Sequence, residues 1–200
     1  FMGKNNPGIR KLAKERILLG DLSDFQSISR FGKENNVDFV VIGPEAPLAI
    51  GITDALKANG LRTVGPTIEC AQLESSKLYM RDLLQKYKIE ANIHYKHFDS
   101  TQGIPEFIKQ IGIENVVVKP DGLTGGKGVK VYGDHLHSQD DILQYCLEIF
   151  REHGKVVIEE KLEGEEFTFI CFVDGTHVVG TPIVQDNKRA YNNDEGPNTG

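Results

Sequence analysis

The sequence has few cysteines and no long apolar run, the features that are typical of disulfide-rich, zinc-binding and membrane-spanning proteins. Its 200 residues include no tryptophan, two methionines and three cysteines. Cys70, Cys146 and Cys171 are far apart and odd in number, which favours reduced thiols in a cytoplasmic protein over a disulfide framework or a zinc site. No apolar run approaches the roughly 18 residues needed to cross a bilayer, so no membrane partner is predicted.

Positive charge is also scarce. There are 23 Lys and Arg against 29 Asp and Glu, which gives a formal net charge of -6, and no block of basic residues occurs. This balance argues against a nucleic-acid partner. A hydrophobic fraction of 39% and a charged fraction of 26% are ordinary for a globular chain of one or two domains.

Residues 37–64 carry the pattern of a βαβ unit. The β-branched run 37–42 ends in Gly43-Pro44, residues 46–59 repeat apolar side chains at helical spacing, and residues 61–64 form a second short run. The sequence therefore predicts an α/β fold that starts with a partial doubly wound, parallel-sheet domain.

The rest of the chain predicts an α+β unit with hairpins. A basic amphipathic helix is expected over 75–88. Further helices are expected over 101–111 and 138–153, and strands over 94–98, 115–120, 129–132, 155–162, 166–174 and 178–184.

The segment Val118–Val129 (VKPDGLTGGKGV) combines glycines with two lysines. Such glycines let backbone N–H groups converge on an anion such as phosphate. The segment is not a Walker A loop, because Lys127 is followed by glycine and not by Ser or Thr. The residues alone leave two interpretations open, a phosphate-binding loop and a hairpin tip with surface lysines. The glycines are Gly122, Gly125, Gly126 and Gly128.

The segment 156–166 (VVIEEKLEGEE) is an apolar strand that runs into carboxylates. Backbone groups at such a strand end can hydrogen-bond to an adenine edge, and a carboxylate further along can accept both ribose hydroxyls. Glu159 and Glu166 bracket the turn, so both can line one cleft. A solvated acidic turn is the alternative. The order of Lys77, the glycine-rich segment and this strand favours nucleotide binding.

That order of segments, from Lys77 through VVKPDGLTGGKGV to VVIEEKLEGEEFTF, resembles the ATP-grasp superfamily. Within it, the sequence is similar to the phosphoribosylamine–glycine ligase family, and the similarity runs through essentially the whole chain. The motifs that carry this resemblance are VIGPEAPLAIGITDAL (Val41–Leu56), GPTIECAQLESSK (Gly65–Lys77), QDNKR (Gln185–Arg189) and GPNTG (Gly196–Gly200).

The resemblance implies an ATP site and a site for two small substrates. Catalysis would fall to Lys77, Lys119 and Lys127, which would reach the phosphates. The other implied nucleotide contacts are Gly122, Gly125, Gly126 and Gly128 as a lid, Glu159 at the adenine amino group, Glu160 and Leu162 through the main chain, and Glu166 at the ribose. The implied substrate contacts are Pro44, Glu45 and Pro47 at the carboxyl end of a parallel strand, and Asp186, Lys188, Arg189, Asn198 and Thr199 around the phosphoribosyl group and glycine.

The implied reaction is the ATP-dependent joining of glycine to 5-phosphoribosylamine in de novo purine biosynthesis. Glycine's carboxylate would attack the γ-phosphoryl group to give glycyl phosphate, and the amine would then displace phosphate. The implied cofactors are ATP and Mg²⁺ or Mn²⁺, with the metal ligands expected beyond Gly200 and none assigned here. A cytoplasmic monomer is expected, with glycine and 5-phosphoribosylamine as its small-molecule partners.

Some features depart from the family pattern. The family's N-terminal glycine-rich strand–turn–helix is missing before Phe1, Asn187 stands where histidine is usual, and Pro120 stands where alanine is common. We therefore expect a piece of a longer protein that is not a complete enzyme by itself. The expected parts are an N-terminal amine-substrate domain over 1–74, the start of the ATP-grasp central domain over 75–97, a lid subdomain over 98–163, and a truncated central domain over 164–200.

Two other functions remain open from the sequence. A different ATP-grasp carboxylate–amine ligase or carboxylase would share the lysines, the glycine-rich segment and the acidic strand, but not GPEAPL, QDNKR and GPNTG. A non-catalytic nucleotide-binding module would use the same lid as a sensor. Release of ADP that depends on both glycine and phosphoribosylamine discriminates against both alternatives.

Overall fold

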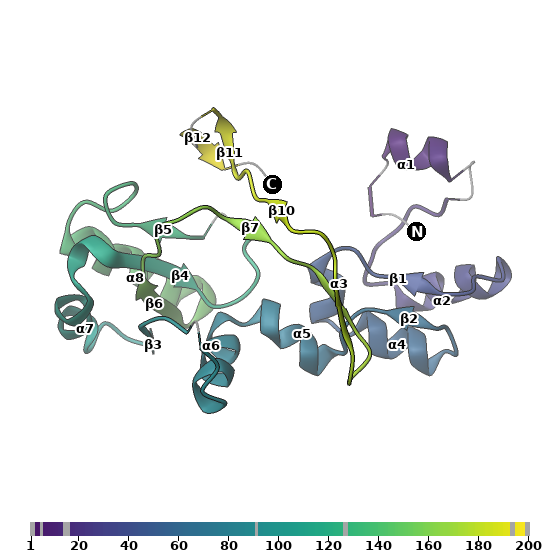
Figure 1. Ribbon diagram of the computed structural model, residues 1–200, viewed down its shortest axis with the longest axis horizontal. Helices are drawn as coiled ribbons and strands as arrows, with labels where there is room; N and C mark the ends of the chain where they lie inside the picture. The colour runs from purple at the N-terminus through teal and green to yellow at the C-terminus, as the bar shows by residue number, and fades with distance from the viewer. Residues whose placement is uncertain are drawn as a thin grey trace. The chain divides into compact units, whose positions relative to one another are not determined.

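The chain forms two compact units, Phe1–Glu90 and Ala91–Gly200, each described here by itself (Figure 1). The computed structural model describes residues 3–4, 6–13, 17–90, 92–125, 128–192 and 195–198. Lys127, Gly126 and Thr199, three of the predicted site residues, lie outside these ranges.

The first unit contains the predicted βαβ arrangement. Strands β1 (Val40–Val41) and β2 (Thr63–Val64) pair in parallel, and helices α3 (Glu45–Ala49) and α4 (Ile52–Ala58) lie between them in the chain. Ile28, Ile52, Leu56 and Leu61 form its buried core. The parallel pairing confirms the prediction for 37–64. The other helices of this unit are α1 (Pro7–Leu12), α2 (Phe25–Glu34), α5 (Ile68–Ser75) and α6 (Lys77–Lys86).

The single helix expected over 46–59 is wrong, because the structure has two. Gly51 separates them with φ of +89°, a left-handed conformation that glycine adopts without steric penalty and that ends α3. Helix α5 was not predicted, since only Ala71 of its residues is buried and its sequence shows no apolar stripe.

The second unit is built on a four-stranded antiparallel sheet. Its order is β3 (Tyr95–Phe98), β6 (Val156–Glu160), β4 (Val116–Pro120) and β5 (Lys130–Val131). Helices α7 (Ile104–Ile111) and α8 (Gln139–His153) and the short 3₁₀ helix η1 (Ile113–Asn115) complete this part. The predicted strands and helices over 94–162 are therefore confirmed, with shorter ends.

The two faces of this sheet differ in character. The side chains of Phe98, Val116, Val118, Val156 and Ile158 are buried with apolar residues of α7 and α8. Because side chains alternate along a strand, Lys119 on β4 and Glu159 on β6 point to the opposite face. The helices thus cover one face and leave the charged residues on the other.

Helix α8 starts at a well-formed cap. The hydroxyl of Ser138 accepts a hydrogen bond from the backbone N–H of Asp141, at 3.1 Å. In return, the Asp141 carboxylate accepts one from the N–H of His137, at 2.9 Å. The hydrogen bonds from His137 and then from Ser138 hold the pKa of Asp141 below its ordinary value of 3.8.

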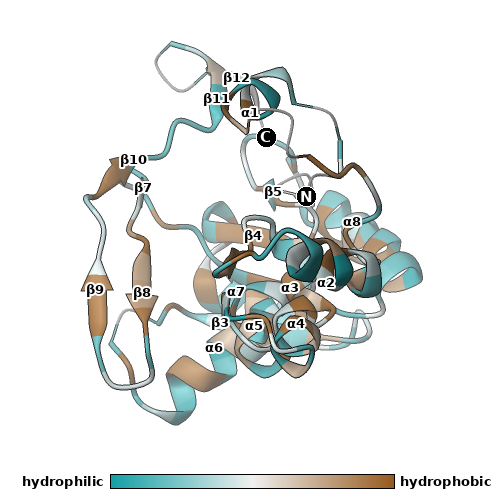
Figure 2. Cartoon of the chain, turned by 90° about the vertical axis from the view of Figure 1, so that its right-hand side faces the viewer, coloured by the Kyte–Doolittle hydropathy of each residue, from teal (hydrophilic) through white to brown (hydrophobic). Residues whose placement is uncertain are grey.

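Hairpins follow the sheet. β7 (Phe167–Thr168) pairs with β10 (Val184–Gln185), β8 (Cys171–Val173) with β9 (Val178–Gly180), and β11 (Arg189–Tyr191) with β12 (Glu195–Asn198), all antiparallel. The runs expected as single strands over 166–174 and 178–184 are each split in two. Figure 2 shows β8 and β9 in the colour of hydrophobic residues, and their apolar side chains are exposed, with Phe172 at 57%. Within the described ranges, no helix is long and apolar enough to cross a membrane.

Candidate functional site

An ion pair joins the central strands of the sheet. Val117 on β4 is the register partner of Glu159 on β6, so Lys119 lies diagonally across from Glu159 on the same face. The Lys119 ammonium is paired with the Glu159 carboxylate. The Glu159 side chain is 3% exposed and that of Lys119 is 25% exposed, so the pair is buried on its acidic side and reaches solvent through the lysine. The structure therefore brings together two of the predicted nucleotide contacts.

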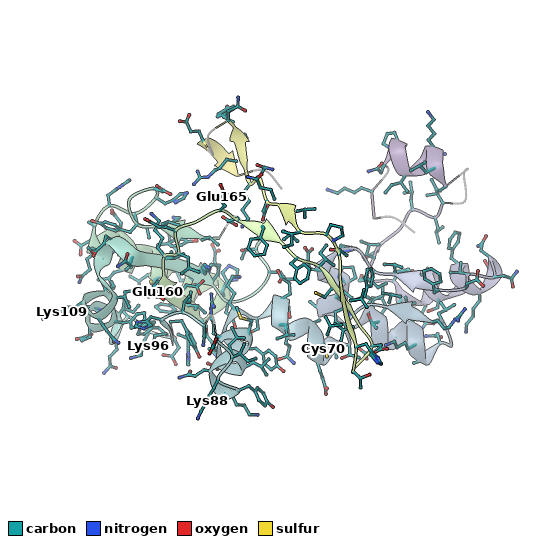
Figure 3. All side chains as sticks on the ribbon, in the orientation of Figure 1. Cys70, Lys88, Lys96, Lys109, Glu160 and Glu165 are labelled. Carbon is teal, nitrogen blue, oxygen red and sulfur yellow. The ribbon has the colours of Figure 1, made fainter. Side chains whose placement is uncertain are left out.

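Glu160 closes the end of β6 against the segment before β3. Its carboxylate accepts a hydrogen bond from the His94 N–H at 3.1 Å, and its own N–H donates to the His94 carbonyl at 2.9 Å. Leu162 follows with an exposed side chain. Figure 3 labels Glu160 and Glu165, which lie near the two ends of the loop between β6 and β7.

A second charged cluster lies where β7 and β10 pair. Lys188 is ion-paired with Glu166, and its ammonium is 3.5 Å from Asp186. The Asp186 N–H donates to the Glu166 carbonyl at 3.0 Å, which fixes the backbone register of the cluster. The hydrogen bond to Glu166 raises the pKa of Lys188, which remains cationic at neutral pH. The predicted ribose residue therefore contacts a predicted substrate residue directly.

Arg189 lies next along the chain and is held from two sides. It donates to the Gly196 carbonyl at 3.0 Å and lies 3.6 Å from the carboxylate of Asp134. Its register partner across the β11–β12 hairpin is Asn198. The structure thus groups these two predicted substrate residues on one hairpin.

The glycine-rich segment connects β4 to β5 as a hairpin. Gly122 has φ of +115° and Gly125 has φ of +58°, and both values favour glycine over other residues. Gly128 returns the chain to β5 close to Pro120, since a Cβ built on it would lie 2.6 Å from the proline Cγ. The hairpin geometry is compatible with both interpretations of this segment.

The remaining predicted residues lie in the first unit. Lys77 is the first residue of α6, which Ser76 caps. Pro44 and Glu45 follow β1 at the start of α3 and are exposed, whereas Pro47 is buried. They therefore lie at the carboxyl end of a parallel strand, as predicted.

Two residues of the second unit that contact predicted site residues were not themselves predicted, Asp134 and Tyr145. Asp134 pairs with Arg189, which is 55 positions further along the chain, and Tyr145 on α8 donates to the Gly128 carbonyl at 2.9 Å. Neither residue has a local sequence signature, because both contacts depend on tertiary packing. In the part of the chain that is described, no group of three or more His, Cys, Asp or Glu side chains is arranged to hold a metal ion.

The sequence matches two family profiles that together cover it. Residues 1–74 match the N domain of phosphoribosylglycinamide synthetase, and residues 75–200 match its ATP-grasp (A) domain. The chain belongs to the phosphoribosylglycinamide synthetase family. Its mixed α/β organisation is the predicted fold class, and the ATP-grasp resemblance is confirmed.

Relatives of this family align with the whole chain. The phosphoribosylamine–glycine ligase of Methanosphaera stadtmanae is 46% identical over 204 residues, which cover 100% of this chain and 46% of the relative. That of Methanothermobacter thermautotrophicus is 45% identical over 203 residues, with the same coverage. The chain therefore spans less than half the length of these relatives.

Solved structures show the same fold. The crystal structure of phosphoribosylamine–glycine ligase from Thermotoga maritima is 31% identical, with a TM-score of 0.64 over 81% of this chain and 39% of that one. The N5-carboxyaminoimidazole synthetase of Staphylococcus aureus, complexed with ADP, has a TM-score of 0.64 at 15% identity, over 94% of this chain and 48% of that one. The second likeness concerns the fold alone.

Proposed function

We propose that this chain contributes to an ATP-dependent ligase that joins glycine to 5-phosphoribosylamine, in de novo purine biosynthesis. The observation that carries the proposal is the Lys119–Glu159 pair on the face of the sheet away from the helix-packed core, beside the strand end at Glu160, in a member of this family. The 46% identity to a phosphoribosylamine–glycine ligase supports the choice of substrates.

In this proposal, the residues that bind ATP lie in the second unit, except Lys77. Lys119, with Lys77 and Lys127, neutralises phosphate charge, and the segment Gly122–Gly128 supplies backbone N–H groups to the same phosphates. Glu159 faces the adenine amino group. Since the Glu160 N–H already donates to His94, its main-chain contact with adenine uses the carbonyl, and Leu162 offers its N–H.

Glu166 binds the ribose hydroxyls. Its ion pair with Lys188 supports this role, because it fixes the carboxylate before the nucleotide arrives. Asp186, Lys188 and Arg189, with Asn198 and Thr199, line the site for glycine and the phosphoribosyl group. Pro44, Glu45 and Pro47 contribute to the amine site from the first unit.

The chemistry needs positioning and charge neutralisation more than a protein nucleophile. One carboxylate oxygen of glycine attacks the γ-phosphorus, the bond to the β-phosphate oxygen breaks, and ADP leaves. The amine of phosphoribosylamine then attacks the acyl carbon and loses a proton, and the C–O bond to phosphate breaks. The products are glycinamide ribonucleotide, ADP and phosphate. Exclusion of water at this stage protects the glycyl phosphate from hydrolysis.

We propose Mg²⁺ as the accompanying cation, since it offsets phosphate charge when bound.

We also propose a division into parts. Residues 1–74 form the amine-substrate domain, 75–97 begin the ATP-grasp central domain, 98–163 form the lid subdomain and 164–200 continue the central domain. We also propose a monomer that acts on small molecules. The three free thiols in the described residues support a cytoplasmic location.

Isotope transfer tests the proposed chemistry. Because the chain covers 46% of the Methanosphaera stadtmanae relative, the assay uses a polypeptide in which this chain replaces the matching part of that ligase. Glycine labelled with ¹⁸O in both carboxylate oxygens is supplied with MgATP and phosphoribosylamine. One ¹⁸O is expected in each released phosphate, because the bridging oxygen of the acyl phosphate comes from glycine. Unlabelled phosphate released during product formation would contradict the glycyl phosphate route.

A further inference from the structure

Tyr145 links helix α8 to the end of the glycine-rich segment. Its side chain packs partly against the core of the second unit, and its hydroxyl donates a hydrogen bond to the Gly128 carbonyl at 2.9 Å. Burial raises the pKa of the Tyr145 phenol above its ordinary value of 10.0, so the hydroxyl keeps its proton at neutral pH. The donor is therefore present under all conditions in which an enzyme of this kind works.

The ring of Tyr145 makes a second contact with Lys130, the first residue of β5, which lies two residues after Gly128. The Lys130 ammonium lies 3.7 Å from the centre of the ring, and it is 3.9 Å from the carboxylate of Glu148, which is three residues further along α8. Cation–π contacts of this geometry are attractive. Tyr145 thus holds both the residue that ends the segment and the residue that begins β5.

Gly128 is closely packed on its other side. A Cβ at this position would lie 2.6 Å from Cγ of Pro120, 3.0 Å from its Cδ and 3.1 Å from Cγ2 of Thr124. Pro120 is the buried last residue of β4. The start and the end of the glycine-rich segment therefore touch each other at Pro120 and Gly128, and the Tyr145 hydroxyl holds the end in place.

Open space lies next to this contact. A cavity of about 300 Å³ is lined by Pro120, Thr124 and Gly128, and by Tyr145, Glu148 and Glu152 of α8. The peptide at Gly128 consequently has room to shift once the hydrogen bond is removed.

We propose that Tyr145 is a positioning residue for the phosphate-binding segment. By fixing the Gly128 peptide, Tyr145 sets where the segment returns to β5, and so it sets the direction of the backbone N–H groups of the described residues Asp121–Gly125 and Gly128. The inference rests on the proposed function, because the N–H groups matter only if they bind nucleotide phosphates. Displacements of about 1 Å at such a site reduce turnover substantially.

Tyr145→Phe tests the proposal, because it removes the hydroxyl and keeps the ring under Lys130. Tyr132→Phe is the matched control, since the Tyr132 hydroxyl also donates to a backbone carbonyl, that of His137, at 3.3 Å. Hydrogen exchange of the 200-residue chain is measured for peptides covering 121–131 and, as a reference, 95–98. With Tyr145→Phe we expect exchange to rise about three- to tenfold in 121–131 and to stay unchanged in 95–98, as loss of one hydrogen bond predicts.

Steady-state kinetics of the chimeric ligase give a second measurement. We expect Tyr145→Phe to raise the KM for ATP and lower kcat, each about three- to tenfold, with the KM for glycine unchanged. A merely structural role would lower the melting temperature and raise exchange throughout the unit without separating the two KM values. Lys130→Met keeps the test open if Tyr145→Phe fails to fold, and should give a smaller change in the same direction.

Equal exchange in 121–131 and an equal KM for ATP in Tyr145→Phe and the unmutated protein would overturn the inference. If the unmutated chimera releases no ADP with glycine and phosphoribosylamine, the proposed function fails instead. In that case the exchange of 121–131 and the affinity of the chain for MgATP still decide whether Tyr145 positions the segment.

Discussion

Replacing Glu159 by glutamine removes the negative charge beside Lys119 and keeps the shape of the side chain. In the folded protein the Glu159 carboxylate is 3% exposed and the Lys119 side chain is 25% exposed. Two unit charges about 4 Å apart interact by about 4 kcal/mol at an effective dielectric constant of about 20. Water around the lysine offsets part of this, so we expect Glu159→Gln to lower the free energy of unfolding of the second unit by about 1–3 kcal/mol.

The assay is amide hydrogen exchange of the slowest protons of β4 and β6, which reports the free energy of unfolding of this unit. A double-mutant cycle with Lys119→Met isolates the interaction between the two side chains, and we expect a coupling of about 1–3 kcal/mol. The matched control is Glu163→Gln, which breaks the pair between Lys161 and Glu163 at 3.5 Å. Glu163 is 85% exposed, so this change should cost less than about 0.5 kcal/mol.

A coupling below about 0.3 kcal/mol, within the usual deviation from additivity of independent sites, would refute a stabilising interaction between Lys119 and Glu159. An effect of Glu159→Gln no larger than that of Glu163→Gln would refute it as well. Either outcome would mean that the buried carboxylate does not hold the Lys119 ammonium in place.

Three further predictions concern the nucleotide, the hairpin and the pH. In a binding titration, Glu166→Gln should weaken the binding of ATP more than the binding of 2′,3′-dideoxy-ATP. An equal loss of affinity for both nucleotides would mean that Glu166 does not bind the ribose hydroxyls. Gly128→Ala should lower the stability of the second unit by about 1–3 kcal/mol, because the new methyl group overlaps Pro120. The control is Gly43→Ala, which should change stability little because open space surrounds Gly43. Equal melting temperatures of the two variants would contradict this prediction. Because the pKa of Asp141 is lowered in the folded chain, its ionised carboxylate stabilises the fold above about pH 4, and this contribution is lost as the pH falls further. Asp141→Asn should therefore flatten the acid limb of a curve of stability against pH.

The sequence predicts the strands of the second unit well, because their apolar runs are continuous. The valines and isoleucine of VVVKP (β4) and VVIEE (β6) are buried. A glycine-rich segment follows β4 and an acidic segment follows β6, and each shows where its strand stops. The pairing of Lys119 with Glu159 was not predicted as a contact, since it depends on the register between β4 and β6.

Breaks within elements and long-range side-chain contacts were harder to predict. The left-handed turn at Gly51 divides a run whose apolar spacing continues through it, so periodicity alone joins α3 and α4. The contact of Glu166 with Lys188 arises from the pairing of β7 with β10, and that of Tyr145 with Gly128 from the packing of α8 beside the β4–β5 hairpin. No local residue pattern specifies either contact.

The most direct test of the proposed function is ADP release by the chimeric ligase with MgATP, with glycine and phosphoribosylamine omitted in turn. We expect ADP release to require glycine and to be sustained only when phosphoribosylamine is also present, because glycyl phosphate forms first and the amine then consumes it. ADP release with another acid or amine would agree with the proposed ATP site but contradict the proposed substrates. Tight MgATP binding without any turnover would contradict the ligase and favour a nucleotide sensor.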